Sequence, residues 1–169
     1  MYNILLTDDE QIVIDSLSFI INENFEGQVN TYTALSGTQA LEVVTNNKID
    51  IIFMDINMPG INGLETISCI TKLKPDTVII MLSAFDKFQY AQEAMNIGAF
   101  KYLTKPFNKN TIIQTIRSAM DLIDSRKDTK IISQELNKNY KLKENYIPND
   151  LEKINLEYAC DNKYLRRKA

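Results

Sequence analysis

The chain has 169 residues and a formal net charge of −3, with 44% hydrophobic and 24% charged residues, which is ordinary for a soluble globular protein. Its apolar runs are far shorter than the roughly 20 residues of a membrane span, and the acidic start MYNILLTDDE predicts no secretory signal. The sequence has no histidine and no CxxC pair, which excludes a histidine nucleophile, a histidine general base and the usual zinc sites. Its two cysteines lie far apart, which fits a reducing cytoplasm.

Five short β-rich runs alternate with five helical patterns over the first 125 residues. The predicted strands are 3–7, 28–33, 50–54, 77–82 and 100–103. Between them apolar residues recur three and four apart, as on one face of an amphipathic helix. The third and fourth runs, DIIFM and TVIIML, are almost continuously apolar, which is typical of central strands covered on both faces. This alternation predicts a parallel sheet between two layers of helices.

Local signals mark the ends of several predicted helices. Ser36 precedes the second helix and Asn108 the fifth, and both residue types accept hydrogen bonds from free N–H groups at a helix start. Gly98 follows the fourth helix, where a left-handed residue often ends a helix. Cys69 lies on the third helix, and we expect it to be an inert packing residue.

Beyond residue 125 the helical pattern weakens. A continued helix would carry apolar residues on one side: Ile131, Ile132, Leu136, Tyr140 and Leu142. Pro148 interrupts it, and a second short helix is predicted over 150–167. Residues 1–125 contain 8 Lys/Arg against 15 Asp/Glu, whereas residues 126–169 contain 11 against 7. This break predicts a main domain, 1–125, and a mainly helical linker or tail, 126–169.

Polar residues follow four of the predicted strands. They are Asp8 and Asp9 after the first strand, Asp55 after the third, Ser83 after the fourth, and Thr104 and Lys105 after the fifth. In an open doubly wound sheet, ligands bind outside the carboxyl ends of the strands. We therefore expect three carboxylates, a hydroxyl and an ammonium to converge in one crevice.

This combination of groups suits phosphoryl transfer to an aspartate. Three close carboxylates repel one another unless a cation joins them, and oxygen ligands without His or Cys favour a hard ion such as Mg²⁺. A lone lysine beside them can neutralise a phosphoryl oxygen. The residues thus predict that Asp55 attacks phosphorus, that Mg²⁺ and Lys105 neutralise charge, and that Ser83 donates a hydrogen bond.

Four motifs in order carry a family resemblance: ILLTDDE, MDINMPGINGLE, MLSA and FKYLTKPF. Over about residues 1–125 the chain resembles the receiver domain of two-component response regulators. The resemblance implies a flavodoxin-like (βα)5 fold with strand order 2-1-3-4-5, phosphorylation by a sensor histidine kinase, and a magnesium cofactor.

The resemblance also implies roles for individual residues. Asp55 matches the phosphoacceptor, Asp9 the direct metal ligand, Asp8 the ligand acting through water, Asn57 the backbone carbonyl ligand, Ser83 the switch hydroxyl, Tyr102 the switch aromatic, and Lys105 the family lysine. Pro106 follows that lysine, where the family commonly has a cis bond. Phosphorylation would reshape the face of the fourth helix, fifth strand and fifth helix, which can pair with another copy.

Plainer structural roles compete with these assignments. Asp8 and Asp9 could cap the first helix, Asp55 could form the turn before MPG, and Tyr102 could be a core residue. Ser83 could be a strand-end polar residue and Lys105 a solvated loop lysine.

Other functions also compete with the receiver. The chain could be the receiver input of a DNA-binding transcription regulator, because INLEYACDNKYLRRKA resembles part of an arabinose-regulator-type helix-turn-helix unit. That output would be incomplete, so DNA binding would need a further domain or the basic tail. A haloacid dehalogenase needs an acid where Asn57 stands, and no GK[ST] phosphate loop is present. We therefore expect no enzymatic activity beyond self-catalysed phosphotransfer and dephosphorylation.

Overall fold

Strands and helices alternate along residues 1–84 and 88–144, which the computed structural model describes. The elements are β1 (Tyr2–Thr7), α1 (Gln11–Asn24), β2 (Val29–Ala34), α2 (Gly37–Asn46), β3 (Ile51–Asp55), α3 (Gly63–Leu73), β4 (Val78–Ser83), α4 (Phe88–Ile97), β5 (Lys101–Thr104) and α5 (Lys109–Glu144). Each predicted strand overlaps an observed strand, and no strand end is displaced by more than one residue. The helix predicted over 150–167 lies outside the described residues.

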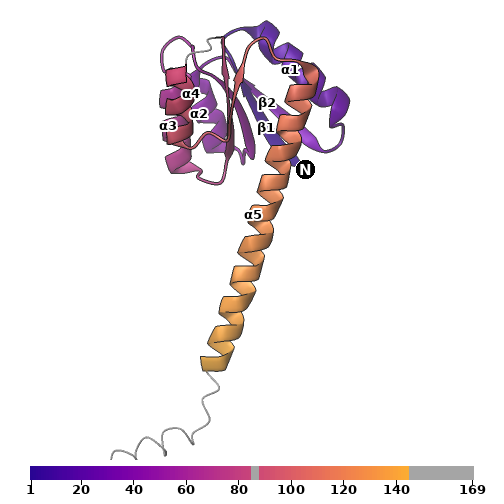
Figure 1. Ribbon diagram of the computed structural model, residues 1–169, viewed down its shortest axis with the longest axis vertical. Coiled ribbons are helices and arrows are strands. Elements are labelled where there is room, and N and C mark those ends of the chain that lie inside the picture. The colour runs from indigo at the N-terminus through magenta and orange to yellow at the C-terminus, as the bar shows by residue number, and fades with distance from the viewer. Residues whose placement is uncertain (85–87, 145–169) are drawn as a thin grey trace, which may run out of the picture. The chain divides into compact units, whose positions relative to one another are not determined.

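The five strands form one parallel sheet in the order β2-β1-β3-β4-β5. The predicted flavodoxin-like strand order is therefore confirmed. Register keeps the strand ends level: the Cα of Asp55 pairs with Leu82, and the Cα of Ser83 pairs with Thr104. Because all strands run the same way, their carboxyl ends meet at one edge of the sheet (Figure 1).

The two faces of the sheet are buried by different helices. On β3, Ile51 and Phe53 belong to the core formed with α1 and α5, whereas Ile52 and Met54 belong to the core formed with α2, α3 and α4. All four side chains are fully buried. Figure 1 shows α2, α3 and α4 on one side of the sheet and α1 on the other. Burial of each such large apolar side chain stabilises the fold by about 1.5–3 kcal/mol.

The expected helix signals are confirmed. The Ser36 hydroxyl accepts a hydrogen bond from the Gln39 N–H, and the Asn108 side chain accepts one from the Thr111 N–H. Gly98 follows α4 with φ of 101°, a left-handed conformation that costs glycine little. The expectation for Cys69 is wrong, because α3 turns this side chain to solvent while its other face packs on the sheet.

Helix α5 changes character along its length. Its first part belongs to a compact unit, Met1–Ser125, and its later part to a second unit, Arg126–Ala169. Ile123 is buried, whereas every residue from Asp124 to Leu136 is exposed. Among the described residues, no helix is both long enough and apolar enough to cross a membrane.

Candidate functional site

Asp8 is held at the end of β1 with a buried side chain. It is 0% exposed, and its backbone N–H donates to the Ala34 carbonyl at 3.2 Å. Its carboxylate accepts a hydrogen bond from the Glu10 N–H at 3.1 Å. Glu10, rather than Asp8 or Asp9, occupies the N-cap position of α1. The polypeptide turn thus fixes one oxygen of Asp8 and leaves the other to face the strand ends.

Asp55 ends β3 and is buried in the same way. Its side chain accepts a hydrogen bond from the Asn57 N–H at 2.7 Å, and the residue is 4% exposed. The next residue, Ile56, continues the sheet by donating its N–H to the Leu82 carbonyl at 3.0 Å. The turn-forming role considered for Asp55 is therefore real, but it uses one carboxylate oxygen only.

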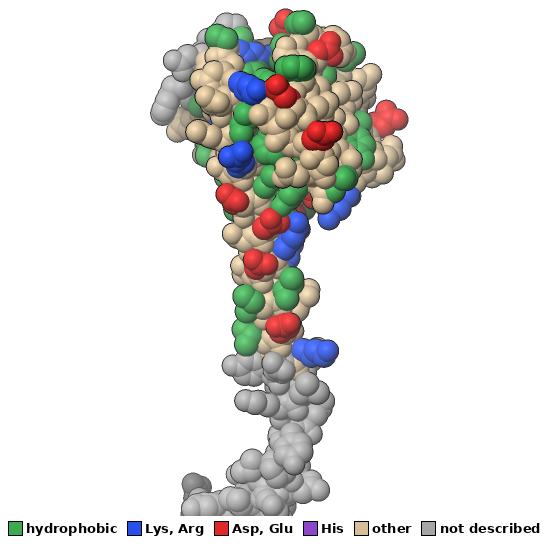
Figure 2. All heavy atoms as spheres, turned by 90° about the vertical axis from the view of Figure 1, so that its right-hand side faces the viewer, with side chains coloured by type: hydrophobic (Ala, Val, Ile, Leu, Met, Phe, Trp, Pro, Cys, Tyr) green, Lys and Arg blue, Asp and Glu red, His purple; other side chains and the backbone are tan. Residues whose placement is uncertain are grey.

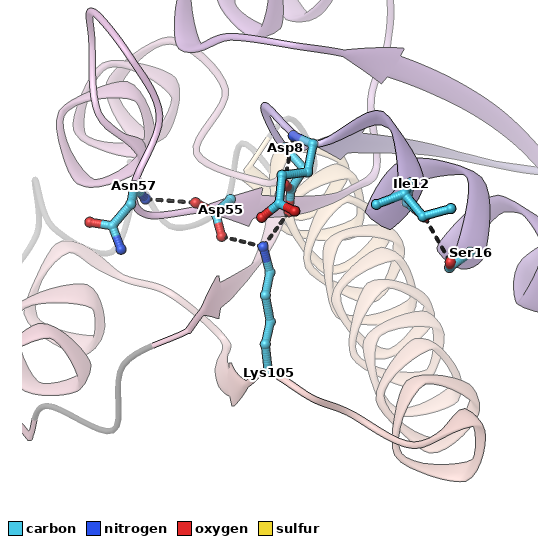
Figure 3. A network of polar contacts seen from close by, with 7 residues as sticks. Asp8, Ile12, Ser16, Asp55, Asn57 and Lys105 are labelled. Carbon is cyan, nitrogen blue, oxygen red and sulfur yellow. Dashed lines mark hydrogen bonds and ion pairs between the residues drawn. The ribbon is translucent and has the colours of Figure 1, made fainter.

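Lys105 joins the two carboxylates. Its Nζ lies 2.6 Å from Asp8 Oδ2 and 2.7 Å from Asp55 Oδ1 (Figure 3). Its backbone N–H donates to the Ser83 carbonyl at 2.7 Å, and the Lys105–Pro106 peptide bond is cis. The side chain is 17% exposed, so the ammonium reaches into the site from a largely enclosed position. The structure thus brings together groups from β1, β3 and the segment after β5.

The charges in this triad do not balance. Two carboxylates share one ammonium, which leaves one excess negative charge in a buried place. Burial raises the pKa of the Asp55 carboxyl, Lys105 opposes that rise, and the nearby Asp8 adds to it. For Lys105, burial favours the neutral amine, but the two carboxylates outweigh burial and raise its pKa. A group that brings positive charge, or that takes up a carboxylate oxygen, would relieve the imbalance.

Four other predicted site residues differ in how far they are buried. Asp9 and Asn57 are exposed, whereas Ser83 is fully buried at the end of β4. Tyr102 lies on β5, is half-buried, and packs against the core beneath α2, α3 and α4. The core role considered for Tyr102 therefore describes its packing here.

The donor chemistry of the site fits a hard divalent cation. Within residues 1–84 and 88–144, no group of three or more His, Cys, Asp or Glu side chains is arranged to hold a metal ion. Two buried carboxylates, Asp8 and Asp55, nevertheless meet at the sheet edge. Asp9 follows Asp8 directly in sequence, and the side-chain ligands that these acids offer are oxygens. These are the ligands that Mg²⁺ prefers, and the excess negative charge favours a cation.

Gly63 is a site residue that the sequence analysis missed. It begins α3, and a Cβ built on it would stand 2.0 Å from the Asp55 carbonyl oxygen. Its N–H donates to the Ile56 carbonyl at 2.9 Å. The available signal was the glycine itself, because glycine is a common choice where another backbone segment comes close. Gly63 thus lets α3 approach the end of β3.

Comparisons with known proteins bear on the family and on the fold. Residues 4–117 match the family model of the response regulator receiver domain. The chain is 39% identical over 116 residues to the uncharacterized transcriptional regulatory protein YesN of Bacillus subtilis, covering 69% of this chain and 32% of that protein. It is 27% identical over 120 residues to sporulation initiation phosphotransferase F of Bacillus subtilis, covering 70% of this chain and 94% of that protein.

A solved structure shows the same architecture. The response regulator receiver domain protein (CheY-like) from Methanospirillum hungatei superposes with a TM-score of 0.70 at 25% identity, covering 75% of this chain and 98% of that one. By contrast, the chain spans 32% and 46% of the length of two curated relatives that it matches, YesN and the sensory transduction protein LytT of Bacillus anthracis.

Proposed function

This chain belongs to the family of response regulator receiver domains, and on that premise we propose that it accepts a phosphoryl group from a sensor histidine kinase on Asp55. The observation that supports this role most directly is the Lys105 ammonium, 2.7 Å from Asp55 and 2.6 Å from Asp8. An ammonium held there can offset charge on an incoming phosphoryl group.

The transfer forms one bond and breaks another. An Asp55 carboxylate oxygen attacks the phosphorus of a phosphohistidine on the kinase, an O–P bond forms, and the N–P bond breaks as the imidazole leaves with its electron pair. The phosphohistidine lies outside these 169 residues, because they contain no histidine. Lys105 neutralises a phosphoryl oxygen, and the buried Ser83 hydroxyl donates a hydrogen bond to another.

We assign the magnesium site to the same edge of the sheet. Asp8, Asp9, Asp55 and the Asn57 backbone carbonyl would hold the ion, with Asp9 as a direct ligand and Asp8 acting through water. When bound, Mg²⁺ supplies positive charge that offsets the negative charge of the carboxylates and phosphoryl oxygens. The one-charge excess of the triad is the feature of this chain that supports the assignment.

The switch would run from Ser83 to Tyr102. Ser83 moves toward the phosphoryl group, and Tyr102 turns further inward into the space that is vacated. The backbone bond from the Lys105 N–H to the Ser83 carbonyl joins the segments that carry the two residues. The face formed by α4, β5 and α5 then changes shape and pairs with a second copy when phosphorylated.

The proposed catalysis is limited to the protein's own phosphotransfer and dephosphorylation. No separate substrate is turned over, so the protein acts as a cytoplasmic signalling module rather than as an enzyme.

A transcriptional output is the second candidate function. One relative is named a transcriptional regulatory protein, and the chain covers 32% of it. The positive balance of residues 126–169 also suits a polyanion. A gel shift of the full chain and of residues 1–125 at several salt concentrations tests this role. Salt-sensitive binding of the full chain alone would support it, and identical behaviour of the two would refute it.

Phosphorylation of Asp55 is tested by incubation with Mg²⁺ and a small acyl phosphate donor. We expect the intact mass to rise by one phosphoryl group, and we expect a chelator or Asp55→Asn to abolish this. Asp50→Asn is the matched control. Asp50 lies directly before the first residue of β3, whereas Asp55 is its last residue, and the Asp50 carboxylate accepts a hydrogen bond from the Asn3 N–H. Labelling that survives in Asp55→Asn would refute the proposal.

A further inference from the structure

Hydrophobic side chains on the surface lie among acidic, basic and other ones in the view of Figure 2. Single apolar side chains in such a mixture are ordinary and do not by themselves mark a binding site. A buried contact between α2 and the loop that joins β3 to α3 is more informative, because this loop carries Asn57.

Gly37, the first residue of α2, is buried against this loop. A Cβ built on Gly37 would stand 2.6 Å from the Ile61 carbonyl oxygen and closer still to the Thr66 hydroxyl. The φ angle of Gly37 is not positive, so its backbone conformation is open to other residues. Alanine is the better helix former, and the lack of space for a methyl group therefore accounts for the glycine.

The loop between β3 and α3 is closed at both ends. At its start the Asn57 N–H donates to the Asp55 carboxylate at 2.7 Å (Figure 3). At its end the Gly63 N–H donates to the Ile56 carbonyl at 2.9 Å. A short loop held in this way has little slack, and packed interiors transmit small displacements. A displacement of Ile61 therefore reaches Asn57, which lies in the same closed loop.

The start of α3 holds Ile61 from the other side. Thr66 is 0% exposed, and its hydroxyl donates to the Asn62 carbonyl at 2.8 Å. The Asn62 side chain caps α3 by accepting a hydrogen bond from the Glu65 N–H at 2.9 Å. Ile61 thus lies between the start of α2 and a capped helix start, so a methyl group on Gly37 would have to displace the loop or α2.

We propose that Gly37 is a positioning residue for the magnesium site, because its missing side chain lets α2 support the loop that carries the Asn57 carbonyl. This role rests on the magnesium site proposed above, in which that carbonyl is a ligand. An added methyl group should displace the carbonyl and weaken Mg²⁺ binding. Asp8 and Asp55 should keep their places, since each is held by its own backbone hydrogen bond and by Lys105.

Calorimetric titration of the full chain with Mg²⁺ tests this role without phosphorylation. Gly37→Ala should bind Mg²⁺ roughly tenfold more weakly than the parent, a loss typical of removing a group that orients a metal ligand. Val44→Ala is the matched control, because Val44 is buried on the same helix about two turns beyond Gly37. This control should lower stability and leave Mg²⁺ affinity unchanged. Parent-like affinity of Gly37→Ala, or equal losses in both variants, would overturn the proposal.

A second pair of variants distinguishes displacement of the loop from displacement of the Thr66 side chain. Gly37→Ala combined with Thr66→Ala removes the hydroxyl nearest to the added methyl group, which also helps the variant to fold. The Ile61 carbonyl stays in place, so the double variant should still bind Mg²⁺ several-fold more weakly than Thr66→Ala alone. Equal affinities of these two variants would refute a role through the loop.

Phosphoryl labelling at several Mg²⁺ concentrations separates this role from the proposed function. Gly37→Ala should need more Mg²⁺ for half-maximal labelling of Asp55 and should approach the parent's rate at saturation, and a rate that stays low there would contradict the role. A parent that binds Mg²⁺ without being labelled would refute the phosphoacceptor role alone, and the titration would still decide the role of Gly37. A parent that binds no Mg²⁺ would refute both the magnesium site and the role of Gly37.

Discussion

At the scale of single residues, Lys105 is the cation that makes two neighbouring buried carboxylates tolerable. Its ammonium contacts both Asp8 and Asp55, and nothing else in the triad carries positive charge. Removing one partner of a buried ionic group leaves an uncompensated charge, which is costly. The water that reaches the partly exposed lysine reduces that cost.

We therefore expect Lys105→Met to lower the free energy of unfolding by about 2–3 kcal/mol, measured by urea denaturation without added metal. Asp55→Asn in the same background should restore much of the loss, because one of the two uncompensated charges is then gone. Lys101→Met, at the other end of β5, is the control and should cost less. A Lys105→Met protein as stable as the parent would contradict this account of the triad.

Gly63 provides a second prediction at the residue scale, because the space beside its Cα is too small for the methyl group of an alanine. Gly63→Ala should cost about 1–3 kcal/mol through steric overlap with the Asp55 carbonyl, and it should also reduce phosphoryl labelling. Gly27→Ala is the matched control: Gly27 has φ of 70° but nothing within 4 Å of an added Cβ. It should cost about 1 kcal/mol through backbone strain alone and leave labelling intact. Equal labelling in the two variants would contradict the role of Gly63.

The meeting of Asp8, Asp55 and Lys105 could be foreseen from the sequence, because the carboxyl ends of parallel strands share one edge. The exposure of Asp9 could not, since the direction of a side chain beyond a strand end depends on how the chain enters the next helix. The contact of Gly63 with Asp55 is a distance between segments that only packing decides. Sequence reasoning thus anticipated that these three side chains meet, and it missed the glycine that lets α3 approach them.

At the scale of elements, β1 is tied to α5 by one hydrogen bond. The Tyr2 hydroxyl donates to the Asp124 carboxylate, and this bond is the main reason why the pKa of Tyr2 rises from 10.0 to about 12. The raised pKa means that folding favours the neutral phenol. The stabilisation is therefore fully present below pH 10 and is lost as the pH rises from 10 to 12.

Tyr2→Phe should lower the free energy of unfolding by about 0.5–1 kcal/mol at neutral pH, a small value because solvent screens this site. The difference between parent and variant should shrink above pH 10 and vanish near pH 12. Asp124→Asn should remove most of the same pH dependence. Urea denaturation at a series of pH values provides the measurement, and a difference that stays constant to pH 12 would contradict the assignment.

The sequence predicted the ends of the central strands more closely than the end of α5. The apolar runs of β3 and β4 located both strands to within one residue, because a strand buried on both faces tolerates few polar residues. The continuation of α5 to Glu144 was only weakly indicated, since polar residues break its apolar stripe and residues 124–136 are all exposed.

At the scale of the whole molecule, the division at residues 125 and 126 predicts independent folding of the first part. Ile123 is the last buried residue in the described part of α5, so cutting after Ser125 removes no described core side chain. Residues 1–125 should unfold within about 0.5 kcal/mol of the full chain and should still be labelled on Asp55. Urea denaturation and intact-mass measurement test both points. Loss of a cooperative transition in the shorter chain would show that the tail is part of the fold.

The two ion pairs of Lys105 have a consequence for how the protein folds during synthesis. Lys105 lies 97 positions from Asp8 and follows the last strand, so a ribosome delivers both acids well before it delivers their shared counter-charge. A nascent chain that has exposed only β1 to β3 contains Asp8 and Asp55 without the lysine that contacts both of them. The buried triad can therefore form only after the segment that follows β5 has left the exit tunnel.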